Sequence, residues 1–131
     1  MKTTTVWKKK EEFKSFQDHN EIELDGNKEK GFSPKALLLS ALAACSGIDV
    51  VEILEKMRVT FSGLEIDAEA EQTTEHPKVF KDIYILYSIR TDPSNENKVK
   101  KAIDLSLEKY CGVSAMLKKN SAIHYKLQLI K

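Results

Sequence analysis

The sequence contains little of what marks a secreted or nucleic-acid-binding protein. Only two cysteines, three prolines and one tryptophan occur in 131 residues, and a domain of this length buries enough surface to fold without disulfides. The charges nearly cancel, with 21 basic and 20 acidic residues, so no long-range field draws the chain towards DNA, RNA or an anionic membrane. We expect a single domain over residues 1–131 that has no nucleic-acid partner.

The chain also has no visible targeting or membrane-spanning segment. Its start lacks the apolar stretch of a signal peptide and carries charge by Lys8, which favours a cytoplasmic protein. The longest uncharged run, Ala36 to Ile48, is closed by Asp49 and is well short of the roughly 20 residues that a bilayer core requires. We expect a buried helix there and no membrane partner.

Metal-ligand spacing is absent as well. The three histidines, His19, His76 and His124, are isolated from one another and from both cysteines, so no metal site is expected. In a reducing cytosol Cys45 and Cys111 start as thiols rather than as a static disulfide. A lone cysteine is commonly just a small buried hydrophobe, so the context of each must show whether it reacts.

Strand patterns occupy the first thirty residues, the middle and the end of the chain. Short apolar groups and the turn signal Asp25-Gly26-Asn27 predict antiparallel strands at the start. Strict alternation over Glu65–Glu71 puts every acid on one face of a strand, and a second alternating strand over Ile83–Ile89 follows the break at His76-Pro77. The two predict a hairpin, and 123–129 alternate as a closing strand.

Two helices are predicted between the strands. Ser33-Pro34 has the signature of a helix start, and good helix formers continue to about Met57. Residues 36–45 are apolar nearly all round, which requires cover on every side, and a partner subunit is the expected cover. Asp92-Pro93-Ser94 caps a second helix that keeps helical spacing up to Cys111, where Gly112 interrupts it. The order of elements predicts an α+β fold.

Two segments carry a family resemblance. Residues 31–45, which end at Cys45, resemble the core signature of the OsmC/Ohr family, the osmotically inducible protein C-like and organic hydroperoxide resistance proteins. Residues 105–114 resemble that family's second motif, a helix ending in a cysteine, although many members have proline where this chain has Gly112. Both motifs stand in family order, and the resemblance covers about residues 20 to 130.

The resemblance implies a fold and an activity. The fold is a two-layer α+β domain, an antiparallel sheet with a long central helix, that forms an intertwined homodimer with its cysteines near the interface. The activity is a thiol-dependent peroxidase acting on organic hydroperoxides. Cys45 would be oxidised to sulfenic acid and Cys111 would condense with it to a disulfide, which an external dithiol then reduces without a metal or organic cofactor.

The groups that would activate Cys45 are not visible in the sequence. Peroxidase members have an arginine in the N-terminal strand region and a glutamate near the helix start, but here no arginine precedes Arg58, and Lys35 and Ala36 occupy the helix start. Asp49, at i+4 from Cys45, would oppose ionisation if it lies near the sulfur.

Three cations remain as candidates for activating Cys45. Lys35 lies about 15 Å away along the same helix, so only a partner subunit's copy of it would reach Cys45. Lys14 and His19 are the other N-terminal candidates. Cys111 has a local reason for reactivity, because the break at Gly112 would place it at the start of the next short helix, whose N–H groups favour a thiolate.

Three functions remain open from the sequence. The first is the two-cysteine peroxidase, for which an apolar pocket beside the Ala/Leu helix would favour an alkyl tail. The second is a homodimer on the same fold that binds an apolar ligand, and the missing arginine favours it. The third is thiol–disulfide exchange without peroxide.

Overall fold

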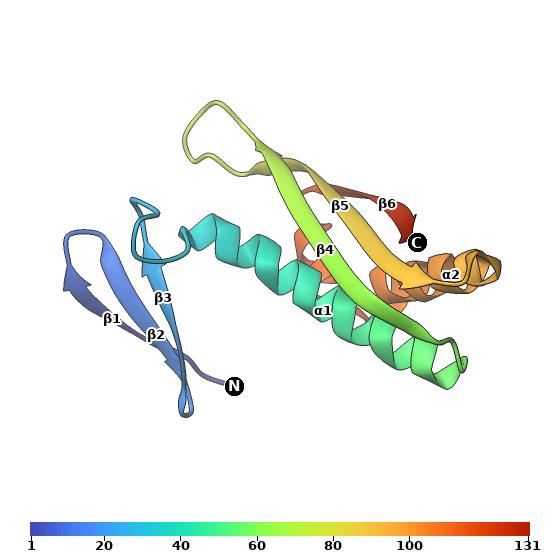
Figure 1. Ribbon diagram of the computed structural model, residues 1–131. Coiled ribbons are helices and arrows are strands. Elements are labelled where there is room, and N and C mark those ends of the chain that lie inside the picture. The colour runs from blue at the N-terminus through green and yellow to red at the C-terminus, as the bar shows by residue number, and fades with distance from the viewer. The chain divides into compact units, whose positions relative to one another are not determined.

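A computed structural model describes all residues from 1 to 131. The chain divides into two compact units, Met1–Leu38 and Leu39–Lys131, and the boundary falls inside the long helix α1 (Pro34–Lys56). The elements confirm the α+β class, with two three-stranded sheets and helices between the strands (Figure 1). That residues 1–131 form one domain stays a prediction.

The first unit holds an antiparallel meander. Its strands β1 (Thr4–Lys9), β2 (Glu12–Gln17) and β3 (Asn20–Asp25) pair in sequence order. The predicted turn after β3 is built on Asp25, whose Oδ1 accepts the N–H of Asn27 at 2.8 Å and whose Oδ2 accepts the N–H of Lys30 at 3.1 Å. These bonds lower the pKa of Asp25 despite its burial, so its carboxylate organises the loop.

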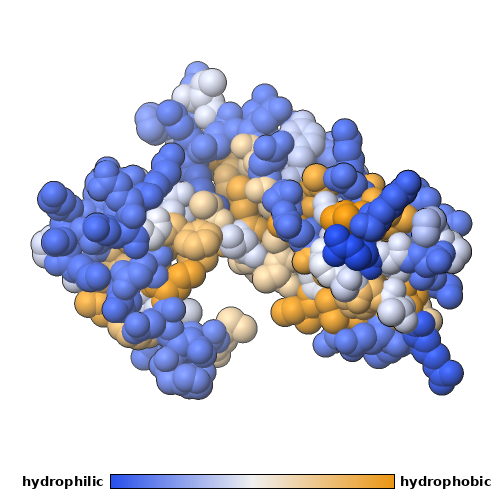
Figure 2. All heavy atoms as spheres, in the orientation of Figure 1, coloured by the Kyte–Doolittle hydropathy of each residue, from blue (hydrophilic) through white to orange (hydrophobic).

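The predicted long helix is present as α1, but one chain covers only part of its surface. A single face is buried, comprising Leu42, Ser46, Gly47, Val50 and Leu54. On other faces Leu38 is 48% and Ile48 60% exposed, and apolar surface interrupts the hydrophilic surface along this helix in Figure 2. By length and composition alone α1 would suffice to cross a bilayer, although its buried face belongs to the protein's own core.

The second unit is built on the sheet β4 (Phe61–Gln72), β5 (Phe80–Thr91) and β6 (Ala122–Ile130), paired in that order. The predicted alternation is confirmed. The acids of β4 are exposed while the residues between them turn inward, and β5 buries Ile83, Ile85, Tyr87 and Ile89. β4 and β5 form the predicted antiparallel hairpin.

The expectation of a wholly antiparallel sheet is wrong for the last strand. β6 pairs parallel to β5, from Asp82 opposite Ala122 to Arg90 opposite Ile130. A parallel neighbour requires a long crossover, and the chain supplies one through η1 (Pro93–Asn95), α2 (Glu96–Leu105), the π-helical turn η2 (Ser106–Tyr110) and α3 (Gly112–Leu117). Strand alternation in a sequence carries no information on strand direction.

The crossover begins as predicted and completes the core. Asp92 Oδ1 accepts the N–H of Ser94 at 2.9 Å, which caps the first turn. Val99, Ala102 and Ile103 of α2 are buried in one cluster with the inward residues of α1 and β5. This core holds α1 and the crossover in fixed positions within the second unit.

Truncating the core should cost far more stability than truncating the surface. Ile103 of α2 is completely buried, whereas Met116 of α3 is 66% exposed. We expect Ile103→Ala to lower the free energy of unfolding by about 2–5 kcal/mol and Met116→Ala by less than about 1 kcal/mol, measured by urea unfolding followed by circular dichroism. Equal losses would contradict this assignment of the core.

Candidate functional site

Both cysteines lie in the second unit, on elements that meet in the core. Cys45 is half-buried on α1, next to the completely buried Ser46. Cys111 is only 3% exposed and stands between η2 and α3. Long-range packing therefore brings together two motifs that are far apart in the sequence.

Cys111 is placed by a π-helical turn. Its backbone N–H donates to the carbonyl of Ser106 at 2.7 Å, the i to i−5 bond of a π-helix. The predicted break is confirmed, since α3 begins at Gly112 and Cys111 is its N-cap, with Sγ accepting the N–H of Ser114 at 3.3 Å. The π-helical turn itself was not predicted, and such turns frequently occur at functional sites.

Cys45 packs against the core cluster that contains Cys111, and the two thiols influence each other electrostatically. Burial raises the pKa of Cys111, the N–H of Ser114 partly opposes this, and a side-chain hydrogen bond with Cys45 raises it further. No lysine, arginine or histidine is among the groups that shift the pKa of Cys111. Cys111 is therefore a neutral thiol at pH 7, in spite of its place at a helix start.

A buried chain of hydroxyl groups ends beside the cysteines. Tyr87 OH and Ser46 Oγ are 2.6 Å apart, Ser46 Oγ and Ser106 Oγ are 2.9 Å apart, and Ser106 Oγ donates to Asp49 Oδ2 at 2.9 Å. The chain joins α1, β5 and η2, and its three hydroxyl-bearing residues are buried. Asp49, considered in the sequence only as an opponent of Cys45 ionisation, is the hydrogen-bond acceptor that ends this network.

Tyr87 is held in its neutral form. Burial raises the pKa of Tyr87 to about 12, while its bond with Ser46 lowers it and the charges of Cys111 and Asp49 raise it. Tyr87 also packs edge-on against Tyr125, with ring centroids 5.8 Å apart. It therefore acts as a fixed hydrogen-bonding group and not as a base near pH 7.

The three candidate cations lie in the first unit. Lys14 of β2 pairs with Glu23 at 3.2 Å and Glu21 at 3.6 Å, and the hydrogen bond to Glu23 and the charges of both acids raise the pKa of Lys14. His19 lies in the turn between β2 and β3, and Lys35 in the first turn of α1. The activating role of each stays a prediction.

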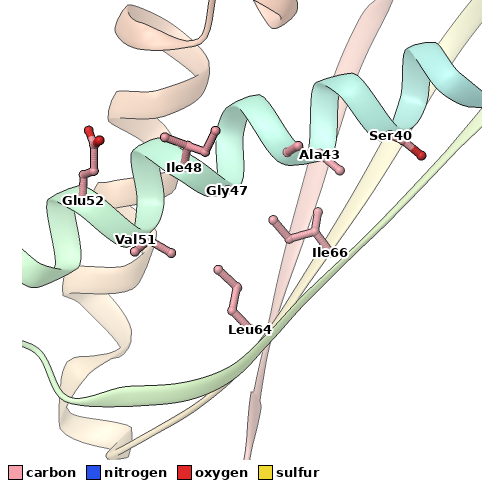
Figure 3. A pocket seen from close by; sticks show the side chains of 9 residues that line it. Ser40, Ala43, Gly47, Ile48, Val51, Glu52, Leu64 and Ile66 are labelled. Atoms are coloured by element: carbon pink, nitrogen blue, oxygen red, sulfur yellow. The ribbon is translucent and has the colours of Figure 1, made fainter. Parts of the chain in front are cut away.

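An apolar groove of about 650 Å³ lies along the flank of α1 beside β4. Figure 3 shows Leu64 and Ile66 pointing from β4 towards the helix, where Gly47 and Val51 line the other wall. A side chain at Gly47 would meet Ile66, because an added Cβ would come within 3.0 Å of its Cδ1. The groove includes Ala44, the residue before Cys45, but the cysteine itself is not among its lining residues.

Sequence reasoning found the two thiols but missed their neighbours. Ser46 and Tyr87 lie outside both motifs and Ser106 was not singled out within the second, although each is a polar group at a position that the periodicity assigns to a buried face. That pattern was the available signal, because a buried hydroxyl needs a partner. No cluster of three or more His, Cys, Asp or Glu side chains able to hold a metal is present.

Alkaline pH should reveal the buried phenol. Tyr87 stays protonated in the folded protein up to about pH 12, whereas in the unfolded chain it ionises near pH 10. The contribution of Tyr87 to the free energy of unfolding is therefore complete below pH 10 and is lost as the pH rises towards 12. At pH 11 the loss is about 1 kcal/mol. Urea unfolding at pH 9 and pH 11 should show a smaller loss for Tyr87→Phe than for wild type. Equal losses in wild type and Tyr87→Phe would show that Tyr87 ionises as readily in the folded protein as in the unfolded chain.

Comparison with known proteins agrees with this architecture. The family model described as "OsmC-like protein" matches residues 25–126. Protein YhfA of Escherichia coli K12 is 35% identical over 112 residues, which is 85% of this chain and 84% of YhfA.

Solved structures share the fold across nearly the whole chain. A hypothetical protein from Aquifex aeolicus VF5 is 30% identical, with a TM-score of 0.84 over 99% of this chain and 97% of that one. The organic hydroperoxide resistance protein OhrB of Bacillus subtilis shares the fold at 15% identity, with a TM-score of 0.67 over 97% and 96% of the two chains. The family model that matches residues 25–126 and the identity of 35% to YhfA over most of both chains show that the chain belongs to the OsmC-like family.

Proposed function

We propose that this protein is a two-cysteine thiol peroxidase that reduces organic hydroperoxides. The observation that carries the proposal is that Cys45 and Cys111 are both free thiols, belong to one core cluster and influence each other electrostatically. A sulfenic acid formed on either sulfur would have the second thiol within reach. The likeness in fold to organic hydroperoxide resistance proteins supports a peroxide as the oxidant.

Exposure and pKa support a division of roles. Cys45 is half-buried and Cys111 nearly completely buried, so a hydroperoxide meets Cys45 first. The Cys45 thiolate attacks the outer oxygen of R–O–OH, the O–O bond breaks, and the alkoxide takes a proton and leaves as alcohol. Cys111, a neutral thiol at rest, gives up its proton as its sulfur attacks the sulfur of the sulfenic acid. Its proton leaves with the hydroxyl group as water, and the disulfide remains.

The apolar groove supports an organic rather than an inorganic substrate. Its walls are mainly alanine, glycine and aliphatic side chains, which suit the alkyl or aryl part of a hydroperoxide. The cycle closes when an external dithiol reduces the Cys45–Cys111 disulfide, and it requires no metal or organic cofactor.

Thiol–disulfide exchange without peroxide is the second candidate. It is favoured by the raised pKa of Cys111, to which no neighbouring cation contributes. It is also favoured because Lys14, one of the candidate activating cations, is already paired with Glu21 and Glu23. Both reactions use the Cys45 thiolate, but exchange with a disulfide needs no peroxide-binding site beside it.

Thiol counting with cumene hydroperoxide tests the assignment. We expect wild type to lose both thiols and consume about one equivalent, Cys111→Ser to consume about one equivalent and stall as sulfenic or over-oxidised acid, and Cys45→Ser to consume almost none. The two single variants should differ because only the sulfur of Cys45 has to react with the peroxide.

Two outcomes of that experiment would contradict the peroxidase. Wild type that keeps both thiols in excess hydroperoxide but loses them to a small disulfide supports exchange instead. Single variants that behave alike would remove the division of roles between the two cysteines.

We also propose that the protein is a homodimer. Leu38 and Ile48 leave large apolar side chains exposed on α1, and water contact over such a helix is unfavourable. Sedimentation equilibrium at micromolar concentration should give twice the chain mass of 14.9 kDa, and Leu38→Glu should shift the protein towards monomer because it introduces a charge into the contact. A stable wild-type monomer would contradict the dimer.

A further inference from the structure

Ser106 connects the backbone of Cys111 to the helix that carries Cys45. Its carbonyl accepts the N–H of Cys111 at 2.7 Å, and its hydroxyl donates to Asp49 Oδ2 at 2.9 Å. Asp49 follows Cys45 by one helical turn on α1. The two cysteines are thus joined by a path of contacts that runs from Cys45 along α1 to Asp49, across to Ser106, and on to Cys111.

Asp49 is the hydrogen-bond acceptor on this path, and it determines where the Ser106 hydroxyl points. An ionised carboxylate only accepts, and a serine hydroxyl has one proton. The Ser106 hydroxyl is also placed to donate to Ser46 Oγ at 2.9 Å, so its single proton has two acceptors within reach. Bonds to a carboxylate are stronger than bonds between neutral groups, so the proton favours Asp49, and Asp49 orients the Ser106 hydroxyl.

This path of contacts is important because the π-helical turn that it holds is locally unfavourable. An ordinary helix would bond each N–H four residues back, whereas η2 bonds Cys111 to Ser106, five residues back. π-Helical turns are rare and occur as single turns, so this one needs an external contact to hold it. The Ser106–Asp49 bond is such a contact, and it comes from the element that bears the other cysteine.

We propose that Asp49, acting through Ser106, is a positioning residue that holds Cys111 against Cys45 and so sets the rate at which the disulfide closes. The inference deepens the proposed function, since closure is the second step of the peroxidase cycle. It does not depend on peroxide, because any oxidant that activates Cys45 leads to the same closure.

Ellman's reagent tests closure alone. In a first phase the Cys45 thiolate attacks the reagent disulfide, releases one thionitrobenzoate anion and keeps the other as a mixed disulfide. In a second phase Cys111 loses its proton to solvent and attacks the Cys45 sulfur, which releases the second anion and leaves the Cys45–Cys111 disulfide. Both phases appear in the absorbance at 412 nm, and the second reports how well Cys111 is positioned.

Four variants separate positioning from charge and from general stability. Asp49→Ala and Ser106→Ala remove the bond, and we expect each to slow the second phase about tenfold. Asp49→Asn loses the same charge as Asp49→Ala but keeps an oxygen acceptor, so its second phase should stay within about threefold of wild type. Ser46→Ala breaks the neighbouring contact and leaves the Ser106–Asp49 bond in place, so it should also stay within about threefold.

The first phase is the internal reference. It should be equal in Asp49→Ala and Asp49→Asn, since both remove the carboxylate charge near Cys45, and circular dichroism should show all four variants folded. If Ser106→Ala does not fold, the pair Asp49→Ala and Asp49→Asn decides the matter alone.

Three results would overturn the positioning role. They are an unchanged second phase in Asp49→Ala, an Asp49→Asn protein as slow as Asp49→Ala, and a wild type with no second phase. A wild type that closes with Ellman's reagent but ignores cumene hydroperoxide would remove the peroxidase and leave the positioning role intact.

Discussion

A hydrogen bond between the hydroxyl of Ser106 and the carboxylate of Asp49 is the contact on which the site depends. It ties the crossover between β5 and β6 to α1 at the level where each element carries its cysteine. The apolar core fixes the two elements roughly, through residues such as Leu42, Val50 and Ile103. Apolar contacts are not directional, so a polar tie is needed to fix Cys111 in one position.

The electrostatic surroundings of the thiols are unusual for a site of this chemistry. Reactive cysteines are commonly paired with a cation, but here burial and the neighbouring sulfur raise the pKa of Cys111 and no cation offsets them. The polar groups built around the pair are hydroxyls and one carboxylate. Such surroundings keep Cys111 a neutral thiol, which would suit the resolving role proposed for it.

Much of the fold was predictable because its signals are local. The alternation in 65–71 and 83–89 marks which faces are buried, and Asp92-Pro93-Ser94 marks a helix start through its own hydrogen bonds. The direction of β6 was not predictable, because a strand has the same period in either orientation. The π-helical turn was missed because the sequence marked only its end, at Gly112, and its distinctive bond lies in the backbone.

The two cysteines of the site were predictable from the sequence, but the hydroxyl network beside them was not. Cys45 and Cys111 stand in motifs, whereas Ser46, Tyr87 and Ser106 acquire their roles only when three elements meet. The sequence also left Asp49 with one role, as a charge beside Cys45, because its partner on η2 lies in a distant part of the chain.

Everything proposed for this site requires that Cys45 and Cys111 form one redox pair. The most direct measurement is the mass of the intact protein after one equivalent of cumene hydroperoxide, followed by a peptide map without reductant. We expect a loss of two hydrogens and a peptide in which Cys45 is linked to Cys111. A protein that instead gains oxygen on Cys45 while Cys111 remains a free thiol, or that forms only disulfides between chains, would contradict it.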